Sequence, residues 1–476
     1  MGFIQIGASI LIALLIGALT PKARTLRMYL LLASSVLAVY WFQPALPIRS
    51  FDFWLPSLSL ALTILTWLVT SPAGSWRLRQ NRVGLSILVG LVTLIDLSRY
   101  LLPEPVITAT APPQFIPYLL FLAILAFGIS LLGFLSRRSS WALTFVILLI
   151  VTILVILKSP ALSLQASIFL RTPANRPIEN AAFSDLRWLG FSYIAFRLIH
   201  VLRDRQMGRL PELSLPEFGT YVVFFPALAA GPIDRAERFS QDLRKDFSLT
   251  QDETLLAGQR LVLGLFKKFV IADTLAIIAL NDALATQVRT TGWMWVVVYA
   301  YAFQIYFDFS GYTDIAIGIA RLVGIRLPEN FAAPYIKPNL TQFWNSWHMS
   351  LTQWFRSYFF HPFNRWMRGL KNIPAWTMIF LGQVATMLLI GLWHGITLNF
   401  IFWGLWHGIG LFLQNRWSEF LRTRDSNIGQ NPRLQSLFQI GGILLTFHFV
   451  ALGWVFFALS DPSLSWQVLS KLLGMW

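Results

Sequence analysis

The sequence of 476 residues contains no cysteine and unusually few charged side chains. Without cysteine, the chain can form no disulfide, no thiolate metal site and no cysteine nucleophile. Charged residues make up only 13% of the chain, whereas about a quarter is usual in soluble proteins. Acidic residues are the scarcer class, with 22 Asp and Glu against 38 Lys and Arg. A chain this poor in charge is not expected to present a typical water-exposed surface.

Long apolar runs take the place of the missing charges. Hydrophobic residues make up 56% of the chain, in segments such as FIQIGASILIALLIGALT and WALTFVILLIVTILVILK. A run of roughly 20 apolar residues is long enough to cross a bilayer as a helix. About a dozen such segments, joined by short polar links, predict an all-α, polytopic integral membrane protein. No link can hold a soluble catalytic domain, so an active site must be built from the spans and their loops.

Basic residues are concentrated in alternate links between the spans. The basic links hold Lys22, Arg24 and Arg27, then Arg77, Arg79 and Arg82, then Arg137 and Arg138, and then Arg203, Arg205 and Arg209. The positive-inside rule then predicts a multi-pass cell-membrane protein with an extracytoplasmic N-terminus. Arginines beside spans also meet anionic lipid, which accounts for the net charge of +16. No basic run alternates with aromatic residues as a nucleic-acid groove requires, so no nucleic-acid partner is expected.

Polar residues divide the chain into two parts. Residues 1–158 are plain apolar helix and are predicted to form an N-terminal transmembrane scaffold. In residues 159–476, charged groups such as Asp308 lie in apolar surroundings, and segments such as FFPALAAGPIDR are broken by Gly and Pro. Irregular backbone at membrane depth must be buried in protein or line a wet cavity. This part is therefore predicted to be one continuous membrane core, with short re-entrant or interfacial helices around a polar interior. Asp308 is interpreted as a buried structural carboxylate paired with a tyrosine or an arginine.

The pentapeptide GLWHG occurs twice, at the two ends of the stretch GLWHGITLNFIFWGLWHG. Its first histidine, His394, is predicted to end a span that begins at Ala375, directly after Pro374. Gly395 is expected to cap that helix in a left-handed conformation. The imidazole of His394 would then lie at a helix end that water can reach, which makes it a candidate for chemistry.

The second histidine, His407, lies inside the next span, predicted over residues 398–413. Gly404 and Gly408 have the small-xxx-small spacing that lets two membrane helices approach closely. Packing, with one hydrogen bond across helices, is therefore the favoured interpretation of His407.

The stretch TQFWNSWHMSLTQWFRSYFF is predicted to form one amphipathic helix. Asn345, His348 and Thr352, three and four residues apart, would form a polar stripe on it. The stripe could touch lipid headgroups at the membrane surface, or it could line the polar interior opposite His394. The pattern leaves both interpretations open. The histidines lack the His-Glu-x-x-His spacing of a zinc site, and no metal is predicted.

Four blocks in this order resemble the membrane-bound O-acyltransferase (MBOAT) family: FFPALAAGPIDRAERF, YFDFSGYTDIAIGIARLVGIRLPENF, FWNSWHMSLTQWFRSYFF and GLWHG. The resemblance covers about residues 190–413 and is strongest to bacterial D-alanyl transfer proteins and alginate O-acetyltransferases. Family members usually have an arginine where this chain has Ser346. That departure leaves the donor and acceptor open, but not the class of reaction.

The resemblance implies transfer of a D-alanyl or acetyl group from a thioester to hydroxyls of a cell-envelope polymer, inside a tunnel through the membrane. It places the catalytic histidine at His394, a second family histidine at His348 and a neighbouring asparagine at Asn345. His394 would act as general base, and His348 or Asn345 could donate a hydrogen bond to the oxyanion.

The resemblance also implies the substrates and partners. The donor would be a phosphopantetheine carrier protein or acyl-CoA, bound as a substrate and not as a tightly held cofactor. Expected partners are an acyl carrier protein or an extracytoplasmic acyltransferase, together with the acceptor polymer and membrane lipid. The alternative function is a transporter or flippase of a lipid-linked envelope precursor. Such transporters often carry inverted repeats, and none is evident.

Overall fold

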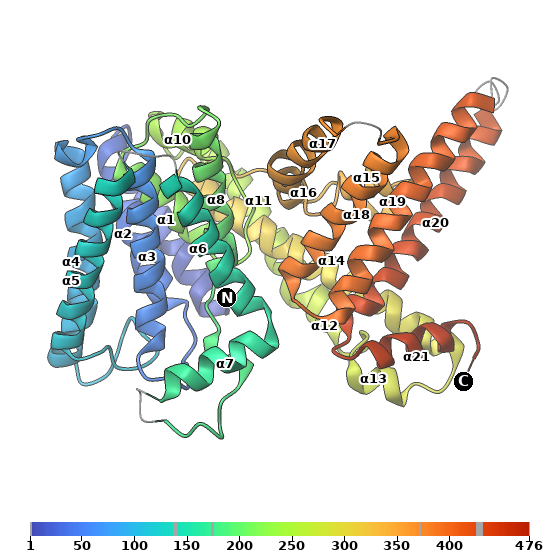
Figure 1. The fold of residues 1–476 in the computed structure, drawn as a ribbon, viewed down its shortest axis with the longest axis horizontal. Coiled ribbons are helices and arrows are strands. Elements are labelled where there is room, and N and C mark those ends of the chain that lie inside the picture. The colour runs from blue at the N-terminus through green and yellow to red at the C-terminus, as the bar shows by residue number, and fades with distance from the viewer. Residues whose placement is uncertain (1, 137–140, 173–175, 371–372, 425–431, 476) are drawn as a thin grey trace. The chain divides into compact units, whose positions relative to one another are not determined.

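The computed structural model describes residues 2–136, 141–172, 176–370, 373–424 and 432–475. All regular elements in these ranges are helices (Figure 1). The all-α prediction is therefore confirmed for the described chain. The predicted basic link at Arg137 and Arg138 lies outside the described residues.

Five helices of the described chain are long and apolar enough to cross a membrane. They are α3 (Phe51–Thr70), α4 (Arg79–Leu101), α6 (Trp141–Lys158), α18 (Ala375–His394) and α20 (Pro432–Ala458), the last over its residues 435–458. Shorter apolar helices, such as α1 (Phe3–Leu19), accompany them. These lengths and compositions support a multi-pass membrane protein.

The chain folds into two compact units, each built from two stretches of sequence. Unit 1 comprises Met1–Leu261 and Ile315–Pro328, and unit 2 comprises Val262–Asp314 and Glu329–Trp476. The long helix α14 (Thr291–Leu322) contributes residues to both. The predicted boundary at residue 158 falls inside unit 1, and the division into scaffold and catalytic core stays a prediction.

The centre of unit 1 is the short helix α9 (Leu215–Val223), which is buried along its whole length. It packs against α2 (Arg24–Trp41), α3 and α4. A Cβ atom on Gly84 of α4 would lie 2.7 Å from Cγ of Pro216, so only glycine allows this approach. The chain leaves α9 through the short turn η3 (Phe225–Ala227), and the buried Arg197 donates hydrogen bonds to the carbonyls of Val222 and Ala227 there. Short buried helices with irregular ends, as predicted, are therefore present.

Unit 2 is organised around the hairpin of α18 and α19 (Leu398–Arg424), beside which α20 packs. In α14, Asp314 pairs with Lys267 at 2.6 Å, and Asp308 pairs with Lys268 at 2.5 Å. The interpretation of Asp308 as a buried group paired with tyrosine or arginine is wrong. Its side chain is 49% exposed and its partner is a lysine, because α14 turns this residue toward Lys268 of the neighbouring segment η4 (Phe266–Ala272).

Candidate active site

His394 is the last residue of α18, which begins at Ala375 directly after Pro374. Both predicted ends of this helix are confirmed. The predicted left-handed cap is wrong, because Gly395 leaves the helix in an extended conformation with φ of −177°. Glycine is needed here for space: a Cβ atom would lie 2.8 Å from the Phe400 ring.

Aromatic rings surround the partly exposed imidazole of His394. Its centroid lies 4.5 Å from that of Trp393 and 4.7 Å from that of Phe457. Phe400 and Trp403 lie at 5.8 Å, with Phe400 stacked on the imidazole. These rings fix the plane of the imidazole and restrict the access of water to it.

His348 lies in a break between two short helices, and the single helix predicted over this segment is wrong. The helices are α15 (Leu340–Trp344) and α16 (Met349–Phe355), and His348 between them has a left-handed φ of 42°. Asn330 causes the break by capping α16. Its backbone carbonyl accepts from the Met349 amide at 3.0 Å, and its Oδ1 accepts from the amide and hydroxyl of Ser350. A continuous helix would leave these groups of the buried Asn330 without partners.

The side chain of His348 is buried near Trp393, one of the aromatic residues around His394. It is 3% exposed, and its ring meets that of Phe309 edge-on at 4.6 Å. The Trp393 ring lies near both histidines, with its centroid 6.3 Å from that of His348 and 4.5 Å from that of His394. Within the described chain, Nε2 of His348 has no hydrogen-bond partner. His348 therefore does not face lipid headgroups.

Asn345 is exposed, and its Oδ1 accepts a hydrogen bond from Nη2 of Arg356 at 2.5 Å. Arg356 begins the π-helical turn η6 (Arg356–Phe360). The break between α15 and α16 thus separates Asn345 from His348, and the predicted polar stripe does not form. The structure gathers His348 and His394 around Trp393 but does not add Asn345 to them.

His407 is fully buried between aromatic rings, the nearest being Trp403 at 5.0 Å and Trp344 at 5.1 Å. The flanking glycines bring α19 against α18, since a Cβ atom on Gly404 or Gly408 would lie 2.8 Å from a backbone atom of α18. The packing interpretation is confirmed. The expected hydrogen bond is not found, because neither ring nitrogen has a partner among the described residues.

A cavity of about 170 Å³ adjoins this region in unit 2. Gln383, Met387 and Ile390 line it from α18, at helical spacing along the face that ends at His394. Arg356 lines it as well. Sequence reasoning missed Gln383, although a lone amide in an apolar span was a usable signal. In the ranges described, no three His, Asp or Glu side chains are placed to hold a metal ion.

The sequence model of the membrane-bound O-acyltransferase (MBOAT) family matches residues 142–452. The chain belongs to this family. The match includes His348, Asn345 and His394, and most of the predicted N-terminal scaffold precedes it.

Three relatives illustrate how far the similarity to other proteins extends. A probable alginate O-acetylase of Pseudomonas syringae pv. tomato is 38% identical, over 56% of this chain and 48% of that protein. A teichoic acid D-alanyltransferase of Bacillus subtilis is 33% identical, over 57% of this chain and 69% of that protein. A peptidoglycan O-acetyltransferase of Helicobacter pylori is 33% identical, over 54% of this chain and 47% of that protein. The chain thus spans about half the length of the acetylating relatives that it matches.

Proposed function

We propose that this MBOAT protein transfers an acyl group, D-alanyl or acetyl, from a thioester to hydroxyls of a cell-envelope polymer, with His394 as general base. The observation that carries the proposal is the position of His394. It ends a membrane-spanning helix, remains partly exposed and shares the Trp393 ring with the buried His348. The three relatives favour transfer over transport, because each is named as a transferase or an acetylase.

The proposed reaction needs only one proton carrier. The acceptor oxygen attacks the thioester carbonyl while His394 takes the hydroxyl proton, and a tetrahedral oxyanion forms. Its collapse breaks the carbon–sulfur bond, and the leaving thiolate takes the proton back from the imidazolium. A thioester is activated enough to react without an enzyme nucleophile, which agrees with a chain that has no cysteine. A positioned base of this kind typically contributes ~10²–10⁴-fold to the rate.

We propose His348 as the hydrogen-bond donor to the oxyanion. It is buried, lies beside the Trp393 ring that also neighbours His394, and its Nε2 is without a partner in the described chain. A preorganised donor in a site with little water stabilises developing charge strongly. Asn345 is the weaker candidate for this role, because it is exposed and its Oδ1 is engaged by Arg356.

The thioester is proposed to reach His394 from the cytoplasm, carried on the phosphopantetheine of a carrier protein or on coenzyme A. Arg365 and Arg368 precede α18 and Arg416 follows within α19, so the end of the hairpin away from His394 is its basic end. The positive-inside rule places that basic end in the cytoplasm. Donor and acceptor then approach His394 from opposite sides, through a polar passage along which acyl groups cross. An acyl carrier protein or an extracytoplasmic acyltransferase is the proposed partner.

Sealed proteoliposomes test the reaction and its direction together. Labelled acyl thioester is supplied on the side of the basic loops, polymer acceptor on the other, and the labelled ester is measured. We expect ester on the acceptor side, and its formation to fall by ~10²-fold or more in His394→Ala with normal detergent behaviour. His361→Ala, at an exposed histidine of α17 (His361–Arg368), is the matched control. Ester confined to the donor side would exclude the passage, and full activity of His394→Ala would exclude the general base.

A further inference from the structure

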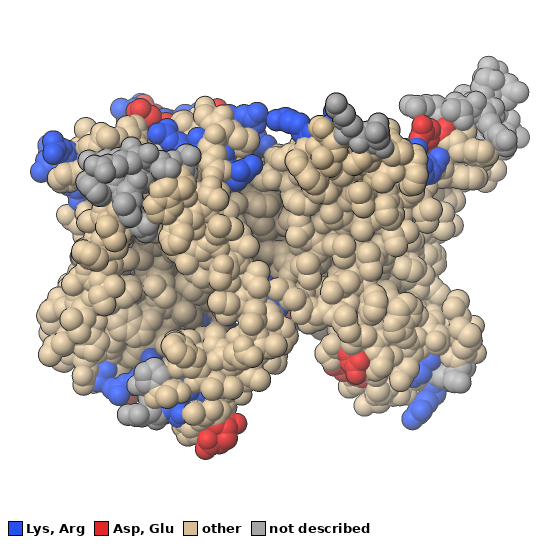
Figure 2. Space-filling view, viewed as in Figure 1, with Lys and Arg blue, Asp and Glu red and all other residues tan. Residues whose placement is uncertain are grey.

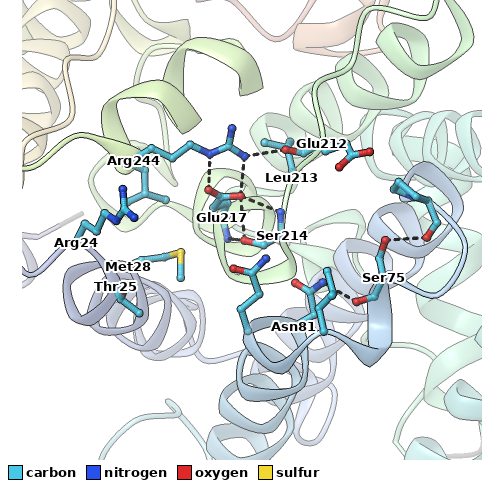
Figure 3. Close-up of a pocket in the computed structure, with 14 residues that line it drawn as sticks. Arg24, Thr25, Met28, Ser75, Asn81, Glu212, Leu213, Ser214, Glu217 and Arg244 are labelled. Atoms are coloured by element: carbon cyan, nitrogen blue, oxygen red, sulfur yellow. Dashed lines mark hydrogen bonds and ion pairs between the residues drawn. The ribbon is translucent and has the colours of Figure 1, made fainter.

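Unit 1 contains a cavity of about 520 Å³ that belongs to another part of the fold than the candidate active site. It lies where α2, α4 and α9 begin and where α10 (Ala236–Arg244) ends. Figure 3 shows Arg24 on one side, Ser75 and Asn81 on the other, and Glu217 and Arg244 between them. The cavity is therefore framed by charged and polar groups at one end of the unit.

Two of the charged groups neutralise each other. Nε of Arg244 donates to Oε1 of Glu217 at 2.6 Å, and the Ser214 amide donates to Oε2 of Glu217 at 2.8 Å. Burial would raise the pKa of Glu217, but these hydrogen bonds outweigh it and hold the pKa below its ordinary value. The Glu217–Arg244 pair therefore stays ionised and adds no net charge to the cavity.

Arg24 is exposed and has no hydrogen-bond or ion-pair partner in the described chain, so its guanidinium is available to a ligand. Glu212 also lines the cavity, but it offers its backbone carbonyl to Arg244, and Figure 3 shows its carboxylate directed away from Arg24. Arg77 and Arg79 flank the lining residues in sequence and add to the positive potential. Figure 2 shows Lys and Arg gathered at this end of unit 1. The cavity therefore favours an anionic ligand.

The helix ends strengthen this preference. Helices α2 and α4 begin at the cavity after Ala23 and Leu78, neither of which caps its helix with a side chain. Their first amide groups therefore present unsatisfied donors and a partial positive charge. By contrast, α9 is capped by Ser214 and Glu217.

The location of the cavity favours a lipid as the anionic ligand. The spanning helix α3 ends just before residues 71–78, and the spanning helix α4 begins just after them. This link therefore lies at the membrane surface. Trp76 in the link is half-exposed, with the guanidinium of Arg77 5.3 Å from its ring centroid, as expected at a bilayer interface. On another face of α4, a shallow groove is lined by Arg79 and Arg82 and then by Val83, Ser86 and Ile87. Cations followed by an apolar groove match a phosphate followed by an acyl chain.

We propose that this end of unit 1 is a binding site for an anionic phospholipid of the phosphatidylglycerol class. The phosphodiester pairs with Arg24 at the beginning of α2, and the headgroup hydroxyls face Thr25 and Ser75. An acyl chain follows Val83 and Ile87 down α4. The bound lipid joins the beginnings of α2 and α4 and stabilises unit 1.

Thermal unfolding of the purified full chain in detergent tests the site. Phosphatidylglycerol, phosphatidylcholine and glycerol 3-phosphate are titrated separately, and the midpoint is recorded against concentration. We expect only phosphatidylglycerol to raise the midpoint. Arg24→Gln should weaken its apparent affinity about tenfold, the effect of losing one charge-assisted hydrogen bond. Arg49→Gln, at an exposed arginine just before α3 begins and away from the cavity, should leave the affinity unchanged.

A second variant separates lipid binding from a structural effect. Gln80→Glu places a carboxylate at an exposed lining position in the first turn of α4, where it stabilises the helix without lipid but repels an anionic headgroup. We expect the midpoint without lipid to be unchanged or raised, and the response to phosphatidylglycerol to be lost. If phosphatidylcholine raises the midpoint as much as phosphatidylglycerol does, the preference for an anionic headgroup is overturned. If glycerol 3-phosphate raises the midpoint, the ligand is a soluble phosphate and the lipid proposal is overturned. Unchanged phosphatidylglycerol binding in Arg24→Gln would overturn the site.

Discussion

The two GLWHG histidines show how identical neighbours in sequence lead to different surroundings. His394 lies at a helix end with its imidazole partly exposed, whereas His407 is fully buried and both its nitrogens lack partners in the described chain. The difference arises because Gly395 is followed by a turn, whereas Gly408 is followed by more helix. A proton carrier needs contact with substrate, and of the two GLWHG histidines only His394 is partly exposed.

His407→Ala should lower the thermal midpoint, because it leaves a cavity among Trp344 of α15, Trp403 of α19 and Phe449 of α20 at a cost of about 2–4 kcal/mol. His407→Leu should recover most of that loss, since it refills the volume and removes two buried nitrogens that have no partner among the described residues. Turnover per folded molecule should stay near that of the wild type in both variants. Midpoints in detergent and acyl transfer by the folded fraction measure the two effects. A well-folded His407→Leu protein without activity would contradict the assignment of His407 to packing.

Asp185 provides a pH-dependent contribution to the stability of unit 1. Burial would raise the pKa of this carboxylate, but hydrogen bonds from Ser167 and Arg171 outweigh it and lower the pKa below its ordinary value. A lowered folded-state pKa adds stability above the unfolded-state value of about 3.9, and this stability is lost as pH falls through the folded-state pKa. Asp185→Asn should therefore lower the thermal midpoint at pH 7, and its difference from the wild type should shrink as pH falls below about 4.

The control for Asp185 is Glu179→Gln, at a nearby exposed carboxylate. Its midpoint should follow that of the wild type at every pH. A difference between Asp185→Asn and the wild type that stays constant from pH 7 to pH 3 would show that the ion pair with Arg171 is not the cause.

Local signals in the sequence predict where a helix begins and ends better than where a helical segment is interrupted. Pro374 and the apolar run after it set the beginning of α18, and the glycine after His394 sets its end. The break at His348 depends on Asn330, which is distant in sequence and caps α16 through tertiary contacts. The aromatic spacing in that segment could not reveal it. The partner of Asp308 was missed for the same reason, because Lys268 reaches it from another element.

The hairpin of α18 and α19 depends on the close approach of the two helices at Gly404 and Gly408. Gly408→Ala should lower the thermal midpoint, because its Cβ atom would lie 2.8 Å from Cα of Val384 and the helices would have to separate. Gly441 in α20 is also helical but has open space around it, so Gly441→Ala should raise stability by about 0.5–1 kcal/mol. Equal midpoints for the two variants would show that the hairpin tolerates a wider separation.

Across the whole molecule, the absence of cysteine makes topology directly measurable. We predict an extracytoplasmic N-terminus, which puts the link at Ser75 in the cytoplasm and the one at Arg49 outside. In intact cells, a membrane-impermeant maleimide should label Arg49→Cys, and it should label Ser75→Cys only after permeabilisation. The wild type provides a background free of thiols. The reverse labelling pattern would invert the orientation proposed here.

Unit 1 is built from two separate stretches of sequence, which has a consequence for its folding during synthesis. Gly17 of α1 packs against the carbonyl of Leu322, and a Cβ atom on Gly324 would lie 2.9 Å from Nη1 of Arg27. Residues 315–328 therefore complete a structure whose other helices leave the ribosome much earlier. Until they emerge, the nascent helices α1 and α2 lack the contacts that residues 315–328 provide at Gly17 and Arg27. We therefore expect a chain that stalls before Pro328 to leave these surfaces of unit 1 uncovered and open to proteases.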